Sequence, residues 1–116
     1  MKLTYEEHVD ATIVKAAGRI TIGAGDVQLR EGVHEVAGRE RHAVILDLGK
    51  VSHIDSSGVG ELVALHRNLD CRGIRLCLTH VNAKIYGLLD LTRLITVFEV
   101  FDSNEDALQS LQPAAA

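Results

Sequence analysis

The stretch that decides the fold runs from residue 43 to residue 62 and reads AVILDLGKVSHIDSSGVGEL. Residues 43–48 are almost continuously apolar, which is typical of a strand buried on both faces of a parallel sheet. We expect a loop over 49–54 and a helix over 57–70, ending before Gly73. The core-facing residues of this helix recur at helical spacing and are Val59, Leu62, Val63 and Leu69.

On the N-terminal side, the sequence predicts a hairpin followed by a helix. Residues 3–9 and 11–17 are expected to be its two strands, with a turn near Asp10. Asp26 can cap the helix, and Gly38 can end it. The apolar residues of this helix are Leu29, Val33 and Val36.

On the C-terminal side, strands and helices continue to alternate. Strands are expected at 74–78 and 97–101, and Asn82 can cap the helix between them. Residues 103–106 have the pattern of a capping box, with a hydroxyl first and a carboxylate three residues later. The apolar residues of the two helices are Ile85, Leu88 and Leu89, and then Ala107, Leu108 and Leu111.

This alternation predicts an α/β sandwich. From residue 43 onward, short loops between strands and helices imply parallel strands with right-handed crossovers, and the initial hairpin adds an antiparallel pair. We therefore expect a mixed sheet of four or five strands with about four helices. Residues 1–112 are expected to form a single domain, and 113–116 a frayed tail.

Composition excludes several classes of function. The formal net charge of −4 argues against nucleic acid and anionic lipid as partners, because both need a basic surface. No apolar run approaches the roughly 18 residues of a membrane helix, and the N-terminus lacks a signal-peptide pattern. We expect a cytoplasmic protein whose two cysteines, Cys71 and Cys77, are ordinary thiols.

The segment DSSGVG, residues 55–60, is the candidate site. It follows a buried strand and opens a helix, where open α/β sheets place their sites. Asp55, Ser56 and Ser57 are all suitable helix caps, although one is enough. Gly58 and Gly60 each cost roughly 1 kcal/mol relative to alanine in a helix. A simple helix cap and a functional site fit these residues about equally.

The chemistry of an enzyme is poorly supported at this segment. Neither serine lies in the Gly-x-Ser-x-Gly pattern of a nucleophile elbow, and no P-loop pattern is present. His53 and His66 flank the segment, although a surface or core role suits them better than a general base. The six histidines form no metal motif. A serine at a helix N-terminus can instead be a substrate, because the helix dipole tolerates an added phosphate.

These residues resemble the STAS domain family, and within it the bacterial anti-sigma factor antagonists. The resemblance covers nearly the whole chain and is most specific from Val44 to Leu62. Further matching segments are 18–21, 73–78 and 88–94. The resemblance implies that Ser57 is the phosphoacceptor, and that the partner-binding surface consists of Asp55, Ser56, Ser57, Gly58 and Gly60.

The same resemblance implies partner switching rather than catalysis. The unphosphorylated domain would bind an anti-sigma factor that is also a serine protein kinase, and phosphorylation of Ser57 would release it. A PP2C-type phosphatase would reset the switch. ATP and magnesium would belong to the kinase, so this chain would need no cofactor and no metal.

Residues 20–25, ITIGAG, depart from the family pattern, which often has polar or acidic residues that contact the kinase. This departure leaves the partner's identity open. One alternative is a STAS-type binding subunit of a transport or other signalling complex without phospho-regulation. Another is a hydrolase that uses Ser57.

Overall fold

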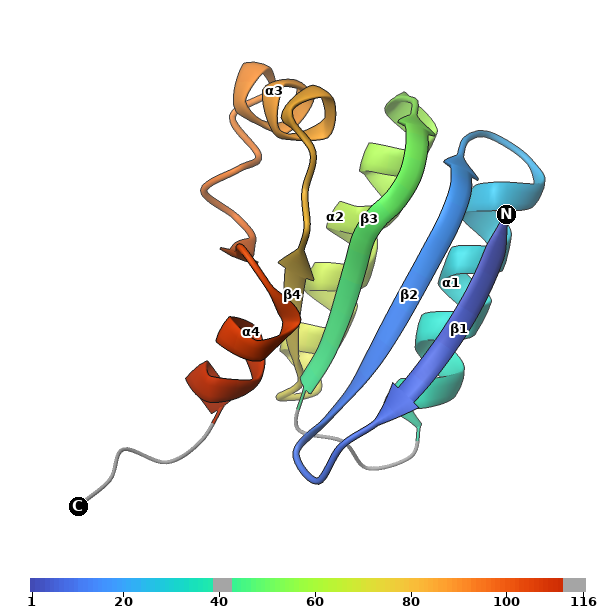
Figure 1. The fold of residues 1–116 in the computed structure, drawn as a ribbon. Helices are drawn as coiled ribbons and strands as arrows, with labels where there is room; N and C mark the ends of the chain where they lie inside the picture. The colour runs from blue at the N-terminus through green and yellow to red at the C-terminus, as the bar shows by residue number, and fades with distance from the viewer. Residues whose placement is uncertain (39–42, 112–116) are drawn as a thin grey trace.

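The computed structural model describes residues 1–38 and 43–111, which form one mixed five-stranded sheet and four helices. In chain order the elements are β1 (Lys2–Glu7), β2 (Ala11–Ile20), α1 (Ala24–Ala37), β3 (Ala43–Ile54), α2 (Ser56–Cys71), β4 (Arg75–Thr79), α3 (Ala83–Leu91), β5 (Glu99–Phe101) and α4 (Asn104–Leu111). The strands lie side by side in chain order, β1 antiparallel to β2 and the others parallel (Figure 1). The predicted α/β class and mixed sheet are confirmed. The expected tail at 113–116 lies outside the described residues.

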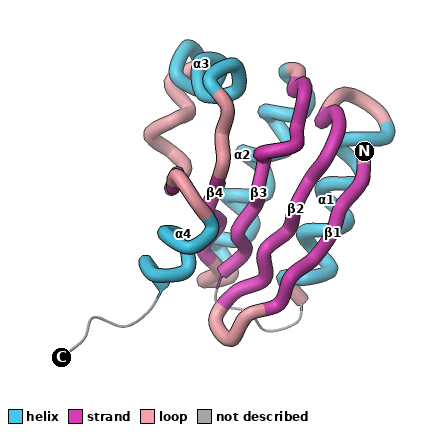
Figure 2. The backbone as a smooth tube through the Cα atoms, viewed as in Figure 1, coloured by secondary structure: helices cyan, strands magenta, loops and turns pink. Residues whose placement is uncertain are grey.

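The helices divide the molecule into layers. Figures 1 and 2 show α1 and α2 together on one face of the sheet, and α4 on the opposite face beside β3 and β4. The larger core lies between the sheet and α1 and α2, and it includes Leu46, Leu62 and Leu65. A smaller core, which includes Ile13, Ile45, Cys77 and Ala107, lies under α4.

The loop expected over 49–54 is wrong, because β3 continues through these residues to Ile54. Its partner β2 is also longer than expected and pairs with it as far as Ile20 opposite Ile54. The register shifts between Lys15 and Ala17, where β3 holds one extra residue. Such a bulge interrupts the alternation of polar and apolar residues. The polar run after Leu48 therefore resembles a loop in sequence.

The predicted cap of α1 is also wrong. The helix begins at Ala24, after Gly23, whose φ of 100° favours glycine, and Asp26 lies inside the first turn. The N-caps of α3 and α4 are as expected. Asn82 Oδ1 accepts the N–H of Ile85 at 2.8 Å, and Ser103 Oγ accepts the N–H of Asp106 at 3.1 Å. Gly38 follows the last residue of α1.

Candidate functional site

Asp55 fixes the start of α2 at the carboxyl end of β3. One carboxylate oxygen accepts the N–H of Gly58 at 2.9 Å, as in an N-cap, and the other accepts the N–H of Ile22 at 2.9 Å. The two bonds join α2 to the loop between β2 and α1. The backbone N–H groups of Ile22 and then Gly58 lower the pKa of Asp55 below its ordinary value, so the carboxylate stays charged at neutral pH.

Gly58 allows the first turn of α2 to approach β2 closely. A Cβ at this position would collide with the carbonyl oxygen of Ile20 and would also lie 2.7 Å from Cγ1 of Ile54. Gly25 makes a similar approach to the carbonyl oxygen of Arg19 from the start of α1. Packing against β2 therefore requires a glycine at residue 58. From the sequence, its low helix propensity is interpreted only as a sign of a functional site. At Gly60 the corresponding position has no heavy atom within 4 Å apart from its own stretch of helix, so Gly60 is free of this constraint.

The two serines are left available by this arrangement. Asp55 is the cap, so the hydroxyls of Ser56 and Ser57 are not needed for that role, and neither bonds to a group in the described part of the chain. Ser56 is exposed and Ser57 is half-buried, both in the first turn of α2. The positive end of the helix dipole favours an anionic group at these positions. A phosphate on Ser57 is chemically compatible with the helix start.

Apolar side chains also lie near this helix start. Ile22, whose backbone N–H bonds to the carboxylate of Asp55, is 76% exposed. A cavity of about 350 Å³ is lined by Ile54, the last residue of β3, and by residues of α3 that include Leu88 and Leu91. The exposed Ile22 was detectable in the apolar 20–25 segment. The cavity, which we call the groove, could not be predicted from the sequence, because its lining residues come from two separate elements.

Cationic groups border the same region. Lys84, in the first turn of α3, also lines the groove. Its charge is the main cause that lowers the pKa of His53, followed by burial and by Arg19. Arg19 and His53 are cross-strand partners in β2 and β3. Lys84 and Arg19 therefore give this region a positive rim.

Among the described residues, neither His53 nor His66, which flank the segment, bonds to Ser56 or Ser57. His53 lies on β3 with its Nδ1 atom 3.2 Å from Ser52 Oγ, and His66 packs edge-on against Phe98 with ring centroids 5.6 Å apart. Within residues 1–38 and 43–111, no three His, Cys, Asp or Glu side chains are grouped to hold a metal ion. No helix in that part of the chain is long and apolar enough to span a bilayer.

The STAS domain model matches residues 2–107, and the chain belongs to this family. Among curated proteins it is similar to the anti-sigma F factor antagonist of Paenibacillus polymyxa. The two are 22% identical over 112 residues, which cover 97% of this chain and 96% of that protein.

Solved structures share the fold. A candidate anti-sigma factor antagonist from Thermotoga maritima superposes with a TM-score of 0.87 at 20% identity, covering 96% of this chain and 95% of that one. The anti-sigma factor antagonist SpoIIAA in its unphosphorylated form gives a TM-score of 0.70 at 16% identity, covering 94% and 96%. The phosphorylated form of the Bacillus cell fate determinant SpoIIAA gives 0.73 at 17% identity, covering 96% and 100%.

Proposed function

We propose that this protein is an anti-sigma factor antagonist that acts by partner switching and is not itself an enzyme. Unphosphorylated, it binds an anti-sigma factor that is also a serine protein kinase. Phosphorylation of Ser57 releases that partner, and a PP2C-type phosphatase restores binding. In this proposal the active unit is the domain of residues 1–112, it works in the cytoplasm, and it needs no cofactor.

The observation that carries the proposal is the division of roles between Asp55 and Ser57. Asp55 alone caps α2, which leaves the Ser57 hydroxyl without a structural bond in the described chain. The similarity to SpoIIAA, which has been solved in a phosphorylated and an unphosphorylated form, supports regulation of this chain by phosphorylation.

The effect of the phosphate follows from electrostatics. A phosphoserine adds a charge of about −1.5 to −2 next to the carboxylate of Asp55. The N-terminus of α2 tolerates this charge in water, so the fold survives. Burying the same charge against a partner without a matching cation is costly and opposes association. The switch therefore needs a change of surface charge and no large motion.

The partner-binding surface proposed here consists of Asp55, Ser56, Ser57 and Gly60, with Gly58 buried beneath it against β2. Ile22, the apolar groove between β3 and α3, and the cations beside it lie next to this surface and extend it. This combination suits a partner with apolar side chains and acidic groups. It also replaces the polar kinase contacts that residues 20–25 do not supply.

The test is phosphorylation of purified protein by native-host lysate with magnesium and ATP, followed by mass spectrometry. We expect one phosphate on Ser57 in the wild type and in Ser56→Ala, and none in Ser57→Ala. The host's kinase-type anti-sigma factors, purified individually, then serve as binding probes. One of them should bind wild type and Ser57→Ala equally and bind Ser57→Asp at least about tenfold more weakly.

Two results would contradict the proposal. The first is no phosphate on Ser57 although a known substrate in the same lysate is labelled. The second is equal binding of wild type and Ser57→Asp to the probe, with both proteins folded by circular dichroism. Either result would favour a STAS-type binding subunit without phospho-regulation. Labelling of Ser57 by an activity-based serine probe would instead favour a hydrolase.

A further inference from the structure

The sheet face opposite α1 and α2 is only partly covered. The helix α4 packs against β3, β4 and β5, and Figure 2 shows β1 and β2 without a helix on that side. A cavity of about 250 Å³ lies on this open face. Its main lining residues are Lys2 and Thr4 from β1, Lys15 and Ala17 from β2, and Asp47 and Lys50 from β3. We call this cavity the lysine hollow.

Strand register builds the lysine hollow as two rows across three strands. In one row, Ala17 pairs with Lys2 on one side and with Lys50 on the other. In the next row, Lys15 pairs with Thr4 and Asp47. Cross-strand partners lie on the same face, about 5 Å apart. The small side chain of Ala17 therefore forms the floor between two long lysine side chains.

The bulge in β3 places a lysine opposite Ala17. Lys15 pairs with Asp47, so an uninterrupted ladder would place Gly49 opposite Ala17. The extra residue in β3 shifts the pairing and places Lys50 there instead. Bulges often re-aim side chains beside functional sites. The second lysine of the row is thus a product of the irregular register.

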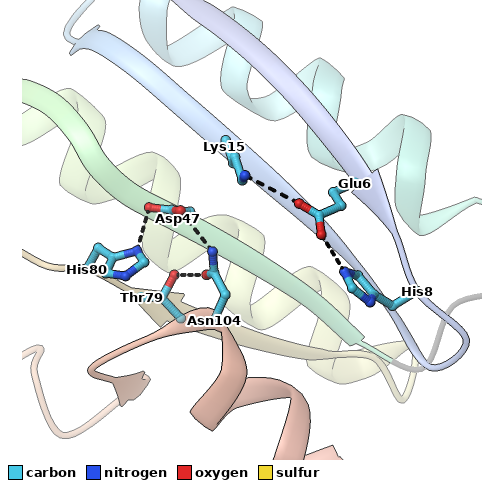
Figure 3. Close-up of polar contacts among 7 residues, drawn as sticks. All are labelled: Glu6, His8, Lys15, Asp47, Thr79, His80 and Asn104. Atoms are coloured by element: carbon cyan, nitrogen blue, oxygen red, sulfur yellow. Dashed lines mark hydrogen bonds and ion pairs between the residues drawn. The ribbon is translucent and has the colours of Figure 1, made fainter.

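The carboxylate of Asp47 does not neutralise the ammonium groups of Lys2 and Lys50 in the lysine hollow. The carboxylate of Asp47 points toward His80 and Asn104 (Figure 3). Its Oδ1 accepts from the Gly49 N–H at 2.9 Å and lies 3.1 Å from His80 Nδ1. Its Oδ2 accepts from Asn104 Nδ2 at 3.0 Å. Lys15 pairs with Glu6 at 3.3 Å. Lys2 and Lys50 form no ion pair with any residue in 1–38 or 43–111. Two uncompensated ammonium groups therefore flank the methyl group of Ala17.

We propose that the lysine hollow binds a small multivalent anion, with at least two phosphate or carboxylate groups, between Lys2 and Lys50. Two strand spacings separate their backbones by roughly 10 Å, and the flexible side chains can converge on a compact ligand over Ala17. Thr4 adds a hydroxyl donor at the edge. The volume suits a small molecule rather than a folded partner. This site lies on the face opposite α2 and does not depend on the role of Ser57.

Inorganic pyrophosphate, titrated into the isotope-labelled full chain and followed by NMR, tests this site. We expect saturable shifts of the backbone amides of Lys2, Ala17 and Lys50, with affinity falling as salt is raised. The double variant Lys2→Gln, Lys50→Gln should bind at least about tenfold more weakly. Arg67→Gln removes a cation from an exposed position on α2, in the opposite layer, and should bind as the wild type does.

Three results would overturn the proposal. One is the absence of saturable shifts at millimolar pyrophosphate and low salt. Another is shifts confined to the first turn of α2, which would place the anion at that helix terminus. The third is equal affinity of the wild type and the double lysine variant, with both spectra well dispersed.

Discussion

At the residue scale, Gly58 and Gly60 differ sharply although they lie two positions apart in one helix. Gly58 touches the backbone of β2 and has no room for a Cβ, whereas the space around Gly60 is open. Gly58→Ala should reduce the free energy of unfolding by at least about 2 kcal/mol, because a backbone carbonyl must move. Gly60→Ala is the matched control. It should stabilise by up to about 1 kcal/mol through helix propensity. Urea denaturation measures both, and equal effects would contradict the packing assigned to Gly58.

Asp55 gives the start of α2 a dependence on pH. Its pKa is lowered in the folded protein by the N–H groups of Ile22 and Gly58, and its unfolded value is about 3.9. The contribution of the carboxylate to stability is therefore complete above pH 4 and is lost as pH falls through the lower, folded pKa. Asp55→Asn should lower the denaturation midpoint at pH 7 and flatten the decline in stability below about pH 4.

The control for this pH dependence is Asp102→Asn. Asp102 is an exposed aspartate between β5 and α4, away from the Asp55 bonds. Denaturant titrations from pH 2 to pH 7 compare the two variants with the wild type. The contrary result is an Asp55→Asn variant whose stability declines below pH 4 as steeply as that of the wild type. It would show that the bonds from the N–H groups of Ile22 and Gly58 do not stabilise the carboxylate in the folded protein.

At the element scale, a polar connection attaches α4 to the sheet. Asn104, the first residue of α4, donates to Asp47 of β3 and accepts from the hydroxyl of Thr79 of β4 (Figure 3). Partial burial raises the pKa of Asp47, but the N–H of Gly49, followed by Asn104 and His80, outweighs it and lowers the pKa below its ordinary value. The helix itself is short and buries only Ala107 completely. These polar bonds therefore add to the apolar contacts that Ala107, Leu108 and Leu111 make in the smaller core.

Asn104→Ala tests this attachment. The fully buried hydroxyl of Thr79 would lose its partner, and the free energy of unfolding should fall by about 2 kcal/mol. Hydrogen exchange should quicken in α4 more than in α2. Gln109→Ala changes an exposed position of the same helix and should leave both measurements nearly unchanged. Slower or equal exchange in α4 of the Asn104 variant would contradict this role.

At the scale of the whole molecule, the reactivities of the two thiols measure how well the core excludes solvent. Cys77 is fully buried in β4, and burial raises its pKa to about 11, while Cys71 is exposed at the end of α2. At pH 8 a thiol reagent should label Cys71 within minutes. It should reach Cys77 only at the rate of global unfolding. Cys71→Ser isolates the slow reaction, and rapid labelling of this variant in native buffer would contradict a closed core.

The sequence by itself determined the features that short-range chemistry encodes. The apolar run at 43–48 predicts a buried strand without reference to any partner. Asn82 and Ser103 cap their helices with bonds to residues three positions away, which local spacing reveals. The alternation of strands and helices then leaves few ways to arrange a mixed sheet. The candidate site was also visible, because three caps and two glycines in six residues are locally inconsistent with an ordinary helix start.

The tertiary structure alone decided what depends on register and on distant backbone groups. The extension of β3 to Ile54 requires the parallel partner β2, which lies about thirty residues earlier in the chain. The choice of Asp55 as the cap uses the N–H of Ile22 from another loop. The difference between Gly58 and Gly60 depends on the carbonyl oxygen of Ile20, and the lysine hollow depends on a bulge. No local pattern encodes these contacts, because strand pairing brings together residues that the sequence keeps far apart.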